Sequence, residues 1–347
     1  VQVASIQTLT RRDKPKADLI IIDETHLACG ASYQKMIEQY QGAIIVGLTA
    51  TPIRLDGRGL GEIYSDIVEV VPMSQLISEG HLVKPRVFAP FTPDLHKFKT
   101  VRGDYDATQI SNEMNKASIT GDIIKHWKQH ADRRKTICFA SSVTHSKNIV
   151  NAFNADGISA KHLDASTPAA QRDETLRAWR EGEFFVLSNC GLFIEGLDVP
   201  AASCCILARP TKSVTIYLQA VGRVMRPHES KTDCVILDHA GLTYDHGFVD
   251  MAREWTLDGK KKRNNENVKA ISVHVCERCF CAYSKIEHPN VCPECGIETA
   301  KTEKVQQVTG GGRLVELDSQ SMETVKQQKR DEEKKARTLD QLIALGK

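Results

Sequence analysis

The stretch Leu19-Ile-Ile-Ile-Asp-Glu-Thr-His26 decides the fold, because four apolar residues run directly into two carboxylates. A continuous apolar run predicts a strand buried on both faces, as in a parallel sheet under helices. Ligands of such sheets lie beyond the carboxyl ends of the strands, so Asp23 and Glu24 should border a cleft. Adjacent carboxylates there suit a Mg²⁺-phosphate site, where one holds the hydrated metal and the other takes a proton from water. The alternative is a strand that ends in a solvated Asp-Glu turn.

Length and composition indicate a protein of about two domains with an additional module. The chain has 347 residues, 41% of them apolar, and a formal net charge of +2. A nucleic-acid site would therefore be a local basic groove rather than a field of the whole protein. The sequence has no apolar run long enough to cross a bilayer. Its first residues lack a signal-peptide pattern and a starting Met, so the N-terminus resembles an internal cut. Six of the eleven Cys are scattered, which favours a reducing compartment, and we expect the cytoplasm.

Strand and helix patterns alternate along most of the chain and predict an α/β protein with two doubly wound parallel sheets. In the first sheet, residues 1–12 are expected to begin with a short strand, and 43–48 to pair with 19–26 across a helix at 31–40. A single helix over 107–131 should open the second sheet. The expected parts are a partial first domain (1–84), a linker (85–106), a second domain (107–257), a basic linker (258–271), a zinc ribbon (272–300) and a charged helical tail (301–347).

The remaining five Cys crowd into residues 276–295 and predict a metal site. Two C-x₂-C pairs about a dozen residues apart are typical of tetrahedral structural zinc, and the expected ligands are Cys276, Cys279, Cys292 and Cys295. Four thiolates close the coordination sphere, so this zinc would be structural and not catalytic. A disulfide is the alternative. Cys281 is a spare, unless it displaces Cys279 as ligand.

Two further stretches carry candidate ligand-binding residues. A helix predicted at 213–225 places Gln219, Arg223 and Arg226 at spacings of one helical face, from which arginines can reach a phosphate. Arginines favoured by the dipole at a helix C-terminus are the alternative. In the loop after the strand at 184–188, glycine lets backbone approach a ligand and Asp198 can accept from a ribose, whereas an ordinary loop with an Asx turn is the alternative.

Taken in order, these stretches resemble the motifs of the superfamily 2 helicases. The matching segments are Asp23-Glu-Thr-His26 (motif II), Thr49-Ala-Thr51 (III), Ile137-Cys-Phe-Ala-Ser-Ser142 (IV), Gly196-Leu-Asp198 (V) and Gln219-Ala-Val-Gly-Arg-Val-Met-Arg226 (VI). The stretch LTATPIRLDGRGLG (48–61), together with the zinc ribbon, is most similar to the DEAD/DEAH-box proteins of bacteria and phages that include RadD and the motor subunits of type III restriction enzymes. The resemblance covers about residues 1–240 and implies two RecA-like domains, the first incomplete.

The resemblance also implies roles for individual residues. Asp23 would hold Mg²⁺ through water, Glu24 would be the catalytic base, and Arg223 and Arg226 would be arginine fingers. The nucleotide would be contacted by His26, Gly196, Asp198 and Gln219. His26 and Thr49 would couple this site to the nucleic-acid groove. Nucleic acid would be contacted by Ser5, Gln7, Thr8, Thr49, Thr51, Ser141 and Ser188.

The family's phosphate-binding motif G-x-x-x-x-G-K-[ST] is absent from these 347 residues, and Thr25 replaces the usual alanine of motif II. We therefore expect a C-terminal part of a longer protein. The expected function is an ATP-dependent helicase or translocase, most readily on DNA, with ATP, Mg²⁺ and Zn²⁺ as cofactors. The alternatives are an inert nucleic-acid-binding or partner-binding fragment and a restriction-type translocase subunit. A protein partner could dock on the zinc ribbon or the tail, and no membrane is involved.

Overall fold

The computed structural model describes residues 1–54, 57–89, 98–101, 104–192, 198–258 and 273–298, and the side chains of 117–121 are not among them. These residues form two compact units. The first contains the described residues up to Arg86 and those from 98 to 258, and the second combines residues 87–89 with 273–298. The predicted basic linker from residue 259 onward and the charged tail lie outside the described residues.

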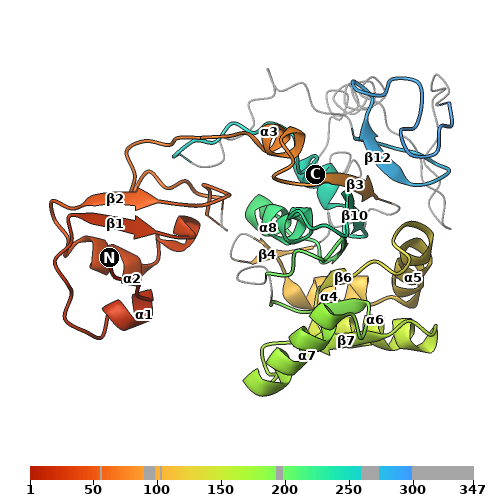
Figure 1. Ribbon diagram of the computed structural model, residues 1–347, viewed down its shortest axis with the longest axis horizontal. Helices are drawn as coiled ribbons and strands as arrows, with labels where there is room; N and C mark the ends of the chain where they lie inside the picture. The colour runs from red at the N-terminus through yellow and green to blue at the C-terminus, as the bar shows by residue number, and fades with distance from the viewer. Residues whose placement is uncertain (55–56, 90–97, 102–103, 193–197, 259–272, 299–347) are drawn as a thin grey trace, which may run out of the picture. The chain divides into compact units, whose positions relative to one another are not determined.

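The first unit begins with a small lobe around two parallel strands (Figure 1). Its elements are α1 (Ile6–Leu9), β1 (Leu19–Ile22), η1 (Thr25–Leu27), α2 (Ala31–Ile37) and β2 (Ile44–Gly47), and α3 (Met73–Ser78) follows them in the chain. Leu19 lies opposite Ile44 in a parallel register, which confirms the expected strand-helix-strand unit. The short strand predicted within residues 1–12 was wrong, because the Ser5 side chain accepts from the Thr8 N–H at 3.2 Å and begins a helix instead.

The apolar run of β1 is covered on one face only. Ile22 is buried in a cluster with Ala28 and Met36, to which α1 and α2 contribute further apolar side chains. Leu19 and Ile21, on the opposite face, are 53% and 59% exposed. The prediction of burial on both faces was therefore wrong for the described residues, because both helices pack against the same side of the strands.

The larger lobe of the first unit holds a five-stranded parallel sheet. Its elements are α4 (Ala107–Met114), α5 (Ala117–His130), β6 (Thr136–Ala140), α6 (Val143–Ala155), β7 (Ala160–Leu163), α7 (Ala169–Glu181), β8 (Val186–Asn189), β9 (Cys204–Ala208), α8 (Val214–Met225), β10 (Asp233–Asp238) and α9 (Leu242–His246). The strand order β10-β9-β6-β8-β7 confirms the second doubly wound sheet. The single helix predicted over 107–131 is two helices, because Lys116 has an extended backbone between them.

Large side chains fill the core of this lobe on both faces of the sheet. Every residue of β6 and β9 is buried, as expected of central parallel strands. Trp127 of α5 is 1% exposed, donates its indole N–H to Thr136 Oγ1 at 2.7 Å, and meets the Phe153 ring edge-on at 5.5 Å. This packing gives the loops at the strand ends a rigid base.

The predicted linker 85–106 contains three short strands, β3 (Lys84–Phe88), β4 (Thr100–Val101) and β5 (Asp104–Tyr105). Asp104 fixes the β4–β5 hairpin to the loop after β9, since its carboxylate accepts from Thr211 Oγ1 and from the Lys212 N–H, each at 2.8 Å. The hairpin is therefore an ordered part of the lobe. The sequence did not predict it, because its strands are too short to show a periodic pattern.

The second unit is a small antiparallel module of β11 (Val273–Val275) and β12 (Cys281–Ser284). Val87 and Phe88, at the end of β3, pair with β12, and the Ala89 N–H donates to the Phe280 carbonyl at 3.0 Å. Almost 200 residues of sequence separate these partners, so the module depends on a strand borrowed from the middle of the chain.

Among the described residues, no helix combines the length and the apolar character needed to cross a membrane.

Candidate nucleotide site and metal centre

Asp23 and Glu24 leave the end of β1 as the sequence predicts. The Glu24 N–H donates to Asp23 Oδ1 at 2.9 Å, and Asp23 is exposed. Glu24 has a left-handed backbone (φ 48°, ψ 48°), which is uncommon for a residue with a side chain. This conformation ends the strand and turns the chain into η1. The two carboxylates therefore lie just beyond the carboxyl end of β1.

A hydrogen-bonded cluster connects this turn to helix α8 of the larger lobe. Gln219 Nε2 lies 3.5 Å from Glu24 Oε2 and 3.4 Å from His26 Nε2. His26 is 3% exposed, and its Nδ1 lies 3.2 Å from Thr49 Oγ1 and 3.4 Å from Glu24 Oε2. The structure therefore brings together motif II, motif III and motif VI. We refer to Glu24, His26, Thr49 and Gln219 as the bridging cluster.

The contacts of the bridging cluster suit one tautomer of His26. Gln219 Nε2 is a donor, so His26 Nε2 accepts and the ring proton is on Nδ1. Thr49 Oγ1 donates to the Thr51 carbonyl at 3.2 Å, so it is free to accept from His26 Nδ1. In this tautomer the single Nδ1–H faces both Thr49 Oγ1 and Glu24 Oε2, and any movement of α8 would break the contacts made by Gln219.

A second bond attaches the same helix to the segment after motif III. Thr215 Oγ1 donates to the Ile53 carbonyl at 3.1 Å. Thr215, Gln219 and Arg223 are spaced by four residues and therefore share one face of α8. Since the first two contact the small lobe, Arg223 lies one turn further along the face that meets it.

Arg226 belongs to a different contact. It is the C-cap of α8 and has an extended backbone, so it leaves the helix, and its guanidinium is paired with the carboxylate of Asp198. The structure thus joins the motif V acid to the second motif VI arginine within the larger lobe. Gly196 lies outside the described residues.

Two of the predicted nucleic-acid contacts have fully buried side chains. Ser188 is 0% exposed and its Oγ lies 2.6 Å from Ser146 Oγ, which is in turn 2.7 Å from His162 Nδ1. Thr51 is also 0% exposed. Neither hydroxyl is available to a phosphate in this conformation, because every residue of β8 is buried and the Thr51 side chain is fully buried as well.

The other predicted contacts lie at or near the surface. Ser5 and Gln7 are exposed, and Thr8 and Ser141 are partly buried. Ser141 Oγ lies 2.8 Å from His145 Nδ1, and burial lowers the pKa of His145 to about 4. His145 is therefore neutral at physiological pH and acts as a fixed polar partner for motif IV.

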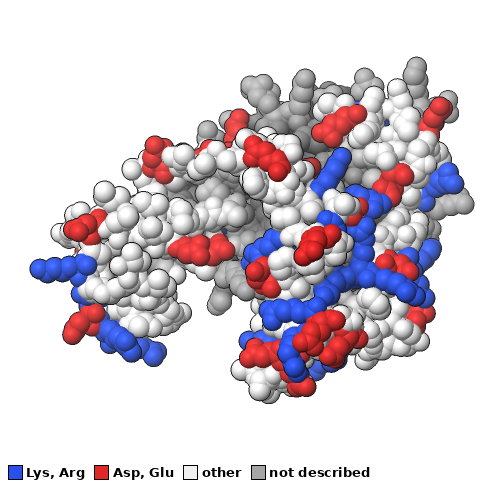
Figure 2. Space-filling model, in the orientation of Figure 1, with Lys and Arg blue, Asp and Glu red and all other residues white. Residues whose placement is uncertain are grey.

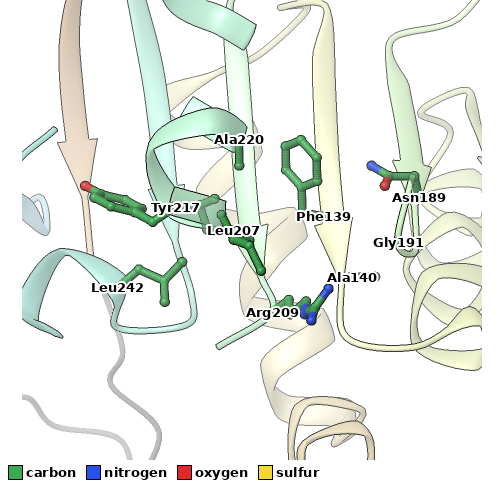
Figure 3. Close-up of a pocket in the computed structure, with 10 residues that line it drawn as sticks. Phe139, Ala140, Asn189, Gly191, Leu207, Arg209, Tyr217, Ala220 and Leu242 are labelled. Carbon is green, nitrogen blue, oxygen red and sulfur yellow. The ribbon is translucent and has the colours of Figure 1, made fainter. Parts of the chain in front are cut away.

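A pocket lies at the carboxyl ends of β6, β8 and β9 (Figure 3), and the sequence motifs did not predict it. Its lining residues are Phe139, Ala140, Asn189, Gly191, Leu207, Arg209, Ile216, Tyr217, Ala220 and Leu242. Most are apolar, and Asn189 and Arg209 supply its polar groups. Arg209 directly follows β9, just as Asp23 follows β1, so the rule for strand ends could have singled it out.

Four cysteines converge in the second unit. The Sγ atoms of Cys276, Cys279, Cys292 and Cys295 all lie within 4.8 Å of one another. Cys276 and Cys295, like Cys279 and Cys292, are separated by 3.6 Å between sulfurs, which is too long for a disulfide. Tetrahedral Zn–S bonds of about 2.3 Å place sulfurs roughly 3.8 Å apart, so the four thiols fit a zinc ion.

The backbone of the two C-x₂-C turns supports the same interpretation. Phe280 and Gly296, which follow the second cysteine of each turn, have left-handed backbones (φ 59° and 68°). Their N–H groups donate to the carbonyls of Cys276 and Cys292, at 2.8 and 3.0 Å. Cys281 is buried and outside the cluster, so it is the spare cysteine in this arrangement.

Comparisons with known proteins agree with these motifs. Residues 115–228 match the model of the "Helicase conserved C-terminal domain", and residues 1–54 match the model of the "Type III restriction enzyme, res subunit". The "51.5 kDa protein" of Lactococcus phage (isolate 7-9) is 33% identical over 292 residues, which cover 83% of this chain and 63% of that protein. "Putative ATP-dependent helicase IRC3" of Saccharomyces cerevisiae is 32% identical over 257 residues, covering 70% and 37%.

A solved structure shares the fold. "The fragment structure of a putative HsdR subunit of a type I restriction enzyme from Vibrio vulnificus YJ016" has a TM-score of 0.56 and 22% identity, covering 74% of this chain and 49% of that one. The chain spans less than two thirds of the length of each of these relatives.

Proposed function

This chain belongs to the superfamily 2 helicases, and from that premise we propose that it supplies the hydrolysis and coupling half of an ATP-dependent DNA motor. The observation that carries the proposal is the bridging cluster, in which the carboxylate of Glu24 is hydrogen-bonded to helix α8 of the other lobe. Phosphoryl transfer needs a positioned water and charge stabilisation from both sides, and a site shared by two lobes provides both.

The proposed roles are those that the resemblance implies, and the positions of the side chains support them. Asp23, exposed at the end of β1, would hold Mg²⁺ through water, and bound Mg²⁺ would offset charge on the phosphoryl oxygens. Glu24 would orient the attacking water. Arg223, on the face of α8 that meets the small lobe, would stabilise the charge that develops on the transferring group.

Coupling of hydrolysis to movement would pass through Gln219. Its amide contacts the catalytic glutamate and the histidine that contacts motif III. A change of charge or position at the phosphate would alter both contacts together, so α8 would shift relative to the small lobe. Repeated opening and closing, with nucleic acid gripped by Ser5, Gln7, Thr8, Thr49 and Ser141, would give stepping along the strand.

DNA is the proposed substrate on two grounds. The first 54 residues match a restriction-enzyme subunit. Lys and Arg side chains also gather in a band over the region of α5, β6 and β10 (Figure 2), although the formal net charge is only +2. Local basic surface of this kind is what a phosphate backbone requires.

ATP turnover by the full-length protein in the presence of nucleic acid tests this proposal. We expect duplex DNA to raise turnover at least tenfold and single-stranded RNA of equal charge to raise it much less, because DNA binding would favour the closed arrangement. Turnover that no nucleic acid changes would contradict the motor, and stimulation by RNA alone would contradict the substrate.

A second candidate function rests on one specific observation. These 347 residues contain no G-x-x-x-x-G-K-[ST] motif, so by themselves they could bind nucleic acid or a partner without turnover. The same assay on the 347-residue chain separates the two functions. Binding of DNA without binding of Mg·ATP would support the second function for this segment.

A further inference from the structure

The side chain of Lys231 joins two segments of the larger lobe by hydrogen bonds, and Lys231 belongs to none of the helicase motifs. It lies in the loop between α8 and β10, is half-buried, and its Nζ donates to the carbonyl of Ala202 at 2.7 Å and to the carbonyl of Val224 at 2.8 Å. One ammonium group thus holds two segments that are more than twenty residues apart in the sequence.

Both segments carry residues of the proposed nucleotide site. Ala202 ends the loop that contains Asp198, four residues earlier, and Val224 directly follows Arg223 in the last turn of α8. The ion pair between Arg226 and Asp198 joins the same two segments. The loop of motif V and the helix of motif VI are therefore fastened at two points, and Lys231 supplies one of them.

A third hydrogen bond holds the end of α8, and its donor lies in the segment that connects the small lobe to β3. The Val83 N–H, just before β3, donates to the carbonyl of Met225 at 2.8 Å. The last turn of α8 consequently has its carbonyls bonded by Lys231 and by the segment that leaves the small lobe. Its position, and with it that of Arg223, depends on these two donors.

Helix capping alone does not explain Lys231. A lysine near a helix C-terminus commonly bonds the last carbonyls, and Lys135 does this in the same lobe by donating to the carbonyl of Arg180 at 2.7 Å. Lys231 differs from Lys135 because its Nζ also bonds a second segment, and burial lowers the pKa of Lys231 to about 8.

We propose that Lys231 is a positioning residue that holds the motif V loop against the last turn of the motif VI helix and so aims Arg223 at the nucleotide. This inference rests on the proposed ATP-dependent function, because Arg223 has no other role assigned to it. Lys231 would not contact the nucleotide itself.

The test is steady-state ATP turnover of full-length variants. Lys231→Met removes both hydrogen bonds of the ammonium group and should lower kcat at least tenfold while changing KM for ATP less than threefold. Lys231→Arg keeps a cationic donor and should retain kcat within about fivefold of wild type. Lys135→Met is the matched control, since it removes a capping lysine from α7 without touching motif V or VI, and should leave kcat within twofold.

A double-mutant cycle with Arg223→Ala separates positioning from general stability. If Lys231 acts through Arg223, the double variant should be no slower than Arg223→Ala alone. Losses that multiply, or an unchanged kcat in Lys231→Met, would overturn the inference. If Lys231→Met fails to fold by circular dichroism, Lys231→Gln, which keeps an amide donor, takes its place in the cycle. A wild-type protein without ATP turnover would contradict the proposed function. An active wild type in which the two losses of kcat multiply would contradict this inference alone.

Discussion

Replacing Glu24 by glutamine in the full-length protein is expected to lower ATP turnover at least 100-fold while leaving Mg·ATP binding within a few-fold of wild type. General-base catalysis by one positioned side chain contributes about 10²–10⁴-fold. Glutamine keeps an oxygen that can accept from Gln219, so the contact to α8 survives and only the basic group is lost. The measurement is kcat from single-turnover hydrolysis, with nucleotide affinity determined separately.

Glu38→Gln is the matched control for this experiment. Glu38 is the exposed C-cap of α2 in the same lobe, so the same change of charge there should leave turnover unaltered. If Glu24→Gln hydrolyses ATP as fast as Glu38→Gln, the assignment of Glu24 as the base is contradicted.

Removing metal from the four-cysteine cluster should unfold the second unit and leave the first folded. Structural zinc contributes an apparent binding free energy of about 10–16 kcal/mol to small modules of this type, far more than two short strands supply. Chelation, or Cys292→Ser, is therefore expected to abolish hydrogen-exchange protection across residues 273–298. Protection should also disappear at Ala89, whose N–H donates to the Phe280 carbonyl.

Cys281→Ser is the control for the metal prediction. Cys281 is buried in β12 but lies outside the cluster, so this variant should retain one zinc per chain by elemental analysis. Equal loss of metal in Cys281→Ser and Cys292→Ser would contradict the ligand set. An unchanged exchange pattern after full chelation would contradict the structural role.

Local patterns in the sequence were enough to predict the sheets and the cysteine cluster. The apolar run that ends at Ile22 and the alternation of strand and helix patterns after residue 136 are typical of parallel sheets, and the C-x₂-C spacing is typical of a zinc site. The pairing of Val87 and Phe88 with β12 was missed, because a two-residue contact across almost 200 residues leaves no periodic trace.

The side chains of the candidate site were predicted less completely than the strands that carry them. The spacing of α8 placed Gln219 and Arg223 on one face but could not show that Gln219 meets His26, which requires the arrangement of two lobes. The resemblance implied that Ser188 faces nucleic-acid phosphates, yet every residue of β8 is buried and the Ser188 hydroxyl contacts Ser146. Lys231 resembled any solvated loop lysine, since the carbonyls it contacts carry no sequence signal.

We propose that the two lobes share one site through the bridging cluster. A double-mutant cycle on His26 and Gln219 tests this sharing most directly. DNA-stimulated ATP turnover would be measured for His26→Ala, Gln219→Leu and the double variant of the full-length protein. Each single change should cost about tenfold, or 1.4 kcal/mol of activation free energy. The structure predicts that the double variant is slower than wild type by well under 100-fold, because both changes remove the His26–Gln219 contact. A loss near 100-fold, the product of two independent effects, would contradict a shared site.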